Sequence, residues 1–226
     1  MGIRSPVLPI WEREKRSNRF DVRPLIEFDG SIIFSPVLAY DLQMRWQNGF
    51  LDFYPPYELG LPATMKSLED WKKFYEDLMV IDLANELKAY GVINVFYDKE
   101  LYKLDPAGHH PEDIGDYDVL ALDEKKKIIW YFECKVLKKI GSIYENRMQQ
   151  MSFFEQHKYD EKFQRRIEYL KEHYSSILKA ISLNQEEYEI IAYMVVNKVF
   201  RSEFKDIGFE ILSYDETKRL LAKYYQ

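Results

Sequence analysis

The feature that most constrains the fold is a pair of apolar segments separated by a short charged turn, within residues 115–136. Residues 116–122 and 128–136 are rich in β-branched, aromatic and other apolar side chains, whereas residues 123–127 are all Asp, Glu or Lys. Apolar runs of this length on either side of a polar turn are typical of adjacent strands. The sequence therefore predicts a buried β-hairpin.

The second strand of this hairpin has two different faces, because successive side chains of a strand point to opposite sides of the sheet. Tyr131, Glu133 and Lys135 share one face. The other face is apolar and needs a helix packed against it; it consists of Trp130, Phe132, Cys134 and Val136. Asp118, on the preceding strand, can point at the same place as Glu133 and Lys135. The hairpin thus predicts a cluster of charged groups at the end of a buried strand.

Burying three ionisable groups is costly unless they pair with one another or bind a metal ion. A cross-strand salt bridge at a sheet edge is one explanation. A metal site is the other, because Mg²⁺ usually takes one or two carboxylates and keeps several waters. A lysine beside that ion can orient or deprotonate an attacking water and stabilise charge that develops on a phosphate. The residues alone leave both explanations open.

The run GDYDVLALD…YFECK resembles the catalytic hairpin of the PD-(D/E)XK nuclease superfamily, in its Mrr-like restriction endonuclease and archaeal resolvase-like branches. The resemblance implies that Asp118 and Glu133 hold Mg²⁺ or Mn²⁺, that the backbone carbonyl of Cys134 adds a ligand, and that Lys135 is the catalytic lysine. Tyr117 stands where the motif has proline. Glu-x-Lys also occurs at four other places, so the specificity comes from the apolar strand and the Asp-bearing strand before it.

The resemblance implies an enzyme, a metal-dependent endonuclease that hydrolyses phosphodiester bonds, and it favours DNA over RNA as the substrate. Roles in restriction, defence or repair follow from it. Many such nucleases cut both strands as dimers, so a homodimer or a partner subunit is expected. Two alternatives stay open: a catalytically silent nucleic-acid-binding or scaffold module of the same fold, and an RNA-cleaving effector.

A third acidic candidate lies on a mostly buried helix predicted over residues 67–90. Glu76 shares one stripe of this helix with the apolar residues four, seven and eleven positions later. Mrr-like nucleases resemble this arrangement with a Phe-Glu pair in the first helix that supplies a further carboxylate, and here the pair is Tyr75-Glu76. Glu76 is therefore a candidate catalytic residue, and Glu86 is the alternative.

Three further residues are candidates beside the site. Gln149 and Gln150 fall in the first turns of a helical tract predicted over residues 142–181 with a break near residue 159, and related nucleases often place a glutamine there. Surface glutamines of an ordinary helix explain them equally well. Asp116 lies on the same strand as Asp118 and is a site-adjacent candidate.

Two other polar groups have simpler explanations. His109 and His110 lie in a loop rich in Pro and Gly, and they are expected to be exposed rather than to bind phosphate or metal. Lys162, Arg165 and Arg166 form a basic cluster, for which a solvated helix face is favoured over a phosphate path.

Composition sets the outer limits. A hydrophobic content of 46% in 226 residues is ample for a core, and a single cysteine excludes an intrachain disulfide and a Cys-based zinc or iron–sulfur site. A net charge of −6 argues against a general nucleic-acid coat but not against a nuclease. Neither a signal peptide nor an apolar run of about 20 residues is recognisable, so a cytoplasmic protein without a membrane span is expected.

The predicted fold class is α/β, with a restriction-endonuclease-like αβββαβ core over about residues 67–200 and a mixed central sheet flanked by helices. Residues 1–62 form an N-terminal extension that contains a basic arm, a strand hairpin turning at Asp29-Gly30, and a segment rich in Pro and aromatic residues. Residues 63–226 form the nuclease-like domain.

Overall fold

The computed structural model describes residues 25–51, 62–137, 143–184, 187–200 and 207–226. The chain divides into two compact units: unit 1 comprises residues 1–72 and 138–151, and unit 2 comprises residues 73–137 and 152–226. The basic arm and most of the segment rich in Pro and aromatic residues lie outside the described residues. A domain boundary at residue 62 stays a prediction.

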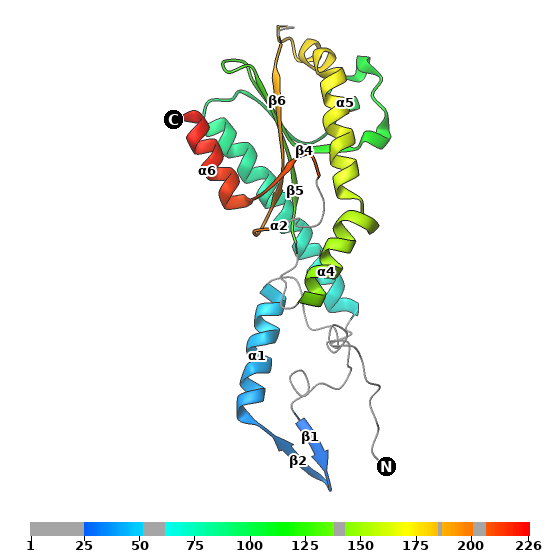
Figure 1. Ribbon diagram of the computed structural model, residues 1–226, viewed down its shortest axis with the longest axis vertical. Coiled ribbons are helices and arrows are strands. Elements are labelled where there is room, and N and C mark those ends of the chain that lie inside the picture. Colours follow the sequence, from blue (N-terminus) through cyan, green and yellow to red (C-terminus); the bar gives the residue numbers. More distant parts are fainter. Residues whose placement is uncertain (1–24, 52–61, 138–142, 185–186, 201–206) are drawn as a thin grey trace. The chain divides into compact units, whose positions relative to one another are not determined.

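Unit 1 contains the predicted hairpin. Strands β1 (Leu25–Phe28) and β2 (Ser31–Phe34) pair antiparallel, and helix α1 (Pro36–Leu51) follows them (Figure 1). Asp29 and Gly30 have φ angles of 50° and 70°. Positive φ at both central residues is what a tight two-residue hairpin turn requires, and Asp-Gly tolerates it. The hairpin prediction is confirmed, and helix α4 (Ile143–Met151) belongs to the same unit.

Unit 2 is built on a five-stranded mixed sheet with the strand order β3-β4-β5-β6-β7. Strands β3, β4 and β5 pair antiparallel, whereas β5, β6 and β7 pair parallel. The strands are β3 (Asn94–Glu100), β4 (Asp116–Asp123), β5 (Ile128–Lys135), β6 (Glu189–Val196) and β7 (Glu210–Ser213). The predicted hairpin over residues 116–136 is therefore β4 and β5, and β5 is the central strand.

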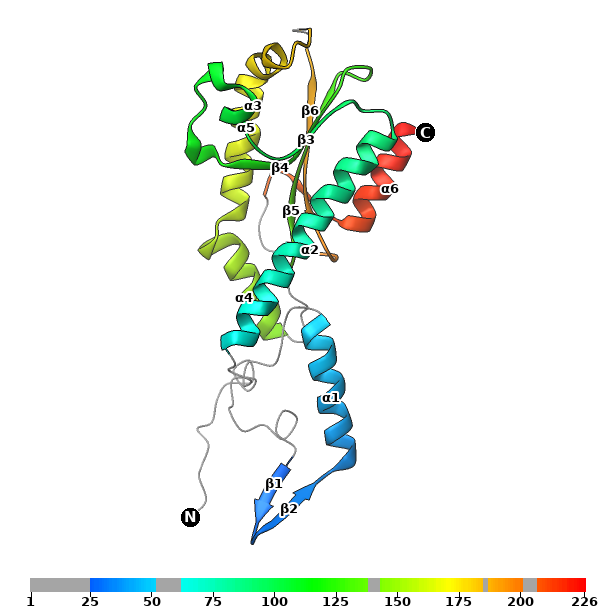
Figure 2. The ribbon, with the colours of Figure 1, turned by 180° about the vertical axis from the view of Figure 1, so that it is seen from behind.

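Helices cover both faces of this sheet (Figures 1 and 2). Helix α5 (Tyr159–Ala180) lies on one face, and α6 (Tyr214–Tyr225) lies on the other with the C-terminal part of α2 (Pro62–Ala89). A one-turn helix, α3 (Leu101–Leu104), follows β3. The general prediction, an α/β fold with a mixed sheet flanked by helices, is confirmed. Among the helices of the described ranges, none has the length and apolarity needed to cross a membrane.

The core confirms the two predicted faces of β5. Tyr131 packs against Phe163 of α5 and against Tyr117 of β4, with ring centroids 5.0 Å and 4.7 Å apart. On the opposite face, the Trp130 indole N–H donates a hydrogen bond to Tyr225 of α6 at 2.9 Å. An indole buried on an apolar face needs such a partner for its N–H. Strand β5 is thus enclosed on both sides, and its charged residues come at its C-terminal end.

Helix α2 departs from the prediction in its length and in its burial. It begins at Pro62, and Phe74, Tyr75, Leu78 and Ile81 are 38–51% exposed. Its buried stripe consists of Met79, Val80, Leu83, Ala84 and Leu87. The prediction that the helix is mostly buried is therefore wrong, because a helix beside a sheet buries one stripe only.

The predicted break in the second helical tract is present. Helix α4 ends at Met151, a π-helical turn covers Ser152–Gln156, and α5 begins at Tyr159. Lys158 has a φ of 50° and is therefore outside helical geometry. The two helices are separate elements, as expected for a tract too long for one helix in a compact domain.

Candidate functional site

The site begins where the β4–β5 ladder ends. The last paired residues are Val119 and Phe132. Beyond this pair, the backbone N–H of Cys134 bonds to a side chain of β4 instead of to its backbone. It donates a hydrogen bond to Asp118 Oδ2 at 2.6 Å. This contact holds the Asp118 side chain against the end of β5, beside Glu133.

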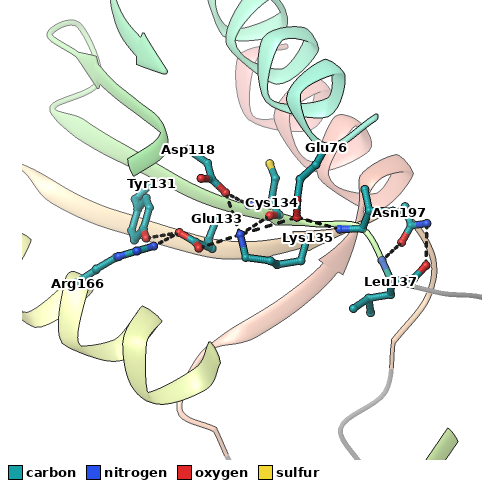
Figure 3. Close-up of polar contacts among 10 residues, drawn as sticks. Glu76, Asp118, Tyr131, Glu133, Cys134, Lys135, Leu137, Arg166 and Asn197 are labelled. Carbon is teal, nitrogen blue, oxygen red and sulfur yellow. Dashed lines mark hydrogen bonds and ion pairs between the residues drawn. The ribbon is translucent and has the colours of Figure 1, made fainter. Parts of the chain in front are cut away.

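The Lys135 ammonium lies among oxygen atoms from three elements (Figure 3). Its Nζ is 3.1 Å from Glu133 Oε1, 3.5 Å from Asp118 Oδ2 and 3.8 Å from Glu76 Oε1. It also donates a hydrogen bond to the Cys134 carbonyl oxygen at 2.8 Å. The structure therefore brings together the four residues predicted as catalytic, namely Asp118, Glu133, Lys135 and Glu76, and the predicted carbonyl ligand. We call these five groups the carboxylate–lysine cluster.

Glu76 joins the cluster because α2 passes the C-terminal end of β5. Its Oε1 accepts a hydrogen bond from the Val136 N–H at 3.2 Å, which fixes the carboxylate at the end of the strand. Glu86, the alternative, lies elsewhere on α2, with its Oε2 3.4 Å from Lys218 Nζ. Of the two candidates on this helix, Glu76 is the one at the cluster.

Glu133 has a second cation that the sequence did not indicate. The guanidinium Nη1 of Arg166 is 2.5 Å from Glu133 Oε2, and the Tyr131 hydroxyl donates to the same oxygen at 2.8 Å. The Arg166 Nε donates to the Ile114 carbonyl at 2.9 Å. Arg166 is therefore part of the site, and its interpretation as a solvated residue of a basic helix face is wrong. Arg165 keeps an exposed position and pairs with Asp113.

Burial and neighbouring charges shift the cluster's ionisation. Burial raises the pKa of the Asp118 carboxyl, and repulsion from Glu133 raises it further. Burial alone would raise the pKa of Glu133 too, but Lys135 and Arg166 outweigh it and hold that pKa below its usual value. Burial lowers the pKa of Lys135, yet Glu133, Asp118 and Glu76 together raise it well above the ordinary lysine value. At neutral pH the lysine is an ammonium ion facing an ionised Glu133.

Asp116 lies in a neighbouring acidic group. Carboxylate oxygens of Asp98, Asp116 and Asp118 all lie within 4.8 Å of one another, with the first two residues exposed. Asp118 thus borders both this group and the carboxylate–lysine cluster, and Asp116 is beside the site. Gln149 and Gln150 lie on α4, which belongs to unit 1, and their role stays a prediction.

The two histidines of the loop after α3 differ. His109 is exposed, as expected. His110 is buried: its Nε2 is 3.0 Å from Asp105 Oδ2, and its Nδ1 is 2.8 Å from the Tyr169 hydroxyl. The expectation that both are exposed is wrong for His110, because a carboxylate and a hydroxyl satisfy its two ring nitrogens. It lies in a polar network between the loop and α5.

Asn197 holds the chain that leaves β5. Its Oδ1 accepts from the Leu137 N–H at 2.8 Å, and its Nδ2 donates to the Leu137 carbonyl at 3.1 Å (Figure 3). The amide side chain thus reproduces the pairing of a neighbouring strand after β6 has ended. In the sequence, Asn197 is an amide residue directly after an apolar strand. That position indicates the contact with Leu137 only when β5 and β6 are known to be neighbours.

The donor set suits a hard divalent cation. Asp118, Glu133 and Glu76 offer carboxylate oxygens and Cys134 offers a carbonyl oxygen, the ligand types that Mg²⁺ and Mn²⁺ prefer. These oxygens already surround one positive charge, the Lys135 ammonium. The residues present therefore fit the metal that the resemblance implies.

Comparison of the chain with protein-family models, curated proteins and solved structures finds no match.

Proposed function

We propose that the chain is a metal-dependent nuclease with a restriction-endonuclease-like core that hydrolyses phosphodiester bonds. The observation that carries the proposal is the convergence of Asp118, Glu133 and Glu76 on the ammonium of Lys135, at the end of a buried strand. A purely structural ion pair needs one carboxylate for one lysine. Three carboxylates and a carbonyl oxygen near one another are the ligand types of a Mg²⁺ site, and their convergence supports the proposal.

The residues have separable roles in this proposal. Asp118 and Glu133, with the Cys134 carbonyl and Glu76, would hold Mg²⁺ or Mn²⁺. When bound there, the ion would supply Lewis-acid chemistry, polarising a phosphate and lowering the pKa of a water. Lys135 orients the attacking water and stabilises negative charge that develops on the phosphate, since a fixed ammonium in a buried site needs little reorganisation.

The substrate class follows from the resemblance of the β4–β5 hairpin to Mrr-like nucleases, most of which cut DNA. The element order supports the same core: helix α2, strands β3, β4 and β5, helices α4 and α5, then strand β6. DNA is therefore proposed as the substrate, and a homodimer or a partner subunit as the form that cuts both strands.

The test is cleavage of supercoiled plasmid, single-stranded DNA and RNA, each with Mg²⁺, with Mn²⁺ and with EDTA. The wild type is compared with Lys135→Ala and with Lys125→Ala, a matched lysine in the exposed turn between β4 and β5. We expect metal-dependent cutting of DNA by the wild type and by Lys125→Ala, and none by Lys135→Ala.

Other outcomes separate the alternatives. Cutting of RNA alone would indicate an RNA-cleaving effector. Cutting that survives in Lys135→Ala would place the activity outside the cluster. Absence of cutting on every substrate, together with absence of Mg²⁺ or Mn²⁺ binding at millimolar concentration, would favour a catalytically silent nucleic-acid-binding or scaffold module.

A further inference from the structure

The two carboxylate oxygens of Glu133 have different partners. Oε1 faces the cluster and lies 3.1 Å from Lys135 Nζ. Oε2 faces α5 and accepts two hydrogen bonds, from Arg166 Nη1 at 2.5 Å and from the Tyr131 hydroxyl at 2.8 Å (Figure 3). Only one oxygen of this carboxylate is therefore directed toward Asp118 and Lys135.

The two donors to Oε2 are themselves held in place. Tyr131 is fully buried, and its ring is packed between Tyr117 and Phe163. Arg166 is anchored through its Nε to the Ile114 carbonyl. Gly115 leaves room for the guanidinium, since a Cβ at this position would lie 2.9 Å from Arg166 Nη2. The orientation of Glu133 is thus set by a rigid pair of donors, which we call the Oε2 clamp.

An oxygen that accepts hydrogen bonds from a guanidinium and a buried phenol is not available as a metal ligand without breaking both. We infer that Arg166 and Tyr131 are positioning residues that restrict Glu133 to one metal-binding oxygen, so that the site selects Mg²⁺ or Mn²⁺ over Ca²⁺. The inference rests on the proposed function. Its chemical reason is that Ca²⁺ takes six to eight oxygens, often from bidentate carboxylates, whereas Mg²⁺ needs an octahedron of single oxygens.

The ratio of the Mg²⁺ and Ca²⁺ affinities is the quantity that reports the effect of the Oε2 clamp alone. Removing the positive charge of Arg166 strengthens the attraction of the cluster for any divalent cation. Because Mg²⁺ and Ca²⁺ carry the same charge, this effect largely cancels in the ratio of their affinities. A change in the ratio therefore reports a change in how many oxygens Glu133 offers. A residue with only a structural role would leave the ratio unchanged.

The experiment is calorimetric titration of Mg²⁺ and of Ca²⁺ into the full-length wild type, Arg166→Gln, Tyr131→Phe and the double variant. Arg165→Gln, a change on the same helix at a residue that pairs with exposed Asp113, is the matched control. Melting temperatures in EDTA identify variants that do not fold. Tyr131→Phe keeps the buried ring and is informative even if Arg166→Gln does not fold.

We expect the Mg²⁺-to-Ca²⁺ affinity ratio to fall by about tenfold in the double variant, a change no larger than the effect that outer partners of metal ligands have on affinity itself. A smaller fall is expected in Tyr131→Phe and none in Arg165→Gln. An unchanged ratio in folded variants that still bind metal would overturn the inference and leave the proposed function intact. A wild type that binds neither cation would overturn both.

Discussion

The guanidinium of Arg166 lies 2.5 Å from Glu133 Oε2, so the carboxylate that we propose as a metal ligand is also half of a buried ion pair. Its other oxygen is 3.1 Å from the ammonium of Lys135. Two cations therefore hold one carboxylate, and Glu133 contributes to the stability of unit 2 as well as to the candidate site.

This double role predicts that Glu133→Gln destabilises the protein in the absence of metal. The change leaves the buried charges of Arg166 and Lys135 without their shared counterion, and breaking a buried ion pair from one side costs about 3 kcal/mol. Urea denaturation in EDTA measures the free energy of unfolding. Glu168→Gln, an exposed change on α5, is the control and should have little effect. A variant more stable than the wild type would mean that repulsion between Glu133 and Asp118 dominates the cluster.

Replacing Gly108 by alanine is predicted to destabilise the fold, because there is no space for a Cβ atom. A Cβ at Gly108 would lie 2.3 Å from Asp105 Oδ2 and 2.5 Å from His110 Nε2. Both side chains are buried and bonded to each other, so neither can move away without breaking the network. We expect Gly108→Ala to lower the free energy of unfolding by about 3 kcal/mol.

Gly91→Ala provides the comparison for this prediction. Gly91 has a φ of 89°, and the nearest atom to an added Cβ is the Lys125 ammonium nitrogen at 4.0 Å. The cost there is backbone strain alone, about 1 kcal/mol. Urea denaturation measures the free energy of unfolding of Gly91→Ala and of Gly108→Ala. Equal losses in the two variants would show that Asp105 and His110 move away from the added Cβ at residue 108.

The strand alternation of residues 128–136 was sufficient to predict both faces of β5 and the approach of Asp118 to Glu133. The reason is that these groups are neighbours along a hairpin, where the short turn fixes which residues meet. The hairpin at Asp29-Gly30 and the break before Tyr159 were predictable for similar local reasons.

Arg166 and His110 were not predictable in this way. Arg166 reaches Glu133 across 33 residues, and the contact depends on how α5 is rotated over the sheet. His110 is buried, and its Nδ1 pairs with the hydroxyl of Tyr169, 59 residues later. The exposed side of α2 was missed for the same reason: its apolar residues surround much of the helix, and only the position of the sheet decides which of them are buried.

The acid sensitivity of the fold is predicted to depend on Asp105. Burial alone raises its pKa, but hydrogen bonds from His110, Ser176 and the Gly108 N–H hold the pKa below the usual aspartate value. The ionised carboxylate therefore stabilises the fold above about pH 4, the pKa of an unfolded chain's aspartate, and this contribution is lost as the pH falls through the lower folded-state pKa.

The measurement is the free energy of unfolding of the wild type and of Asp105→Asn from pH 7 to pH 3. We expect the difference to shrink as the pH falls below about pH 4. Asp113→Asn, at an exposed carboxylate paired with Arg165, should show little difference at any pH. A difference for Asp105→Asn that grows on acidification would contradict the assignment of a lowered pKa.

Asn197→Ala is predicted to loosen the end of β5. The change removes both hydrogen bonds to Leu137, each of which contributes about 1 kcal/mol. We expect a loss of stability of about 2 kcal/mol and faster hydrogen exchange of the Leu137 amide. Asn197→Asp should restore only the bond from the Leu137 N–H. An unchanged exchange rate for the Leu137 amide in Asn197→Ala would show that the contact does not hold this segment.

The assignment of the carboxylate–lysine cluster as a catalytic site is tested by Mg²⁺-dependent cleavage of a supercoiled plasmid by the wild type beside Asp118→Asn and Lys125→Ala. We expect nicked or linear DNA with the wild type and with Lys125→Ala, and intact plasmid with Asp118→Asn and in every EDTA lane. Equal cleavage by Asp118→Asn and the wild type would contradict the assignment of the carboxylate–lysine cluster as the catalytic site.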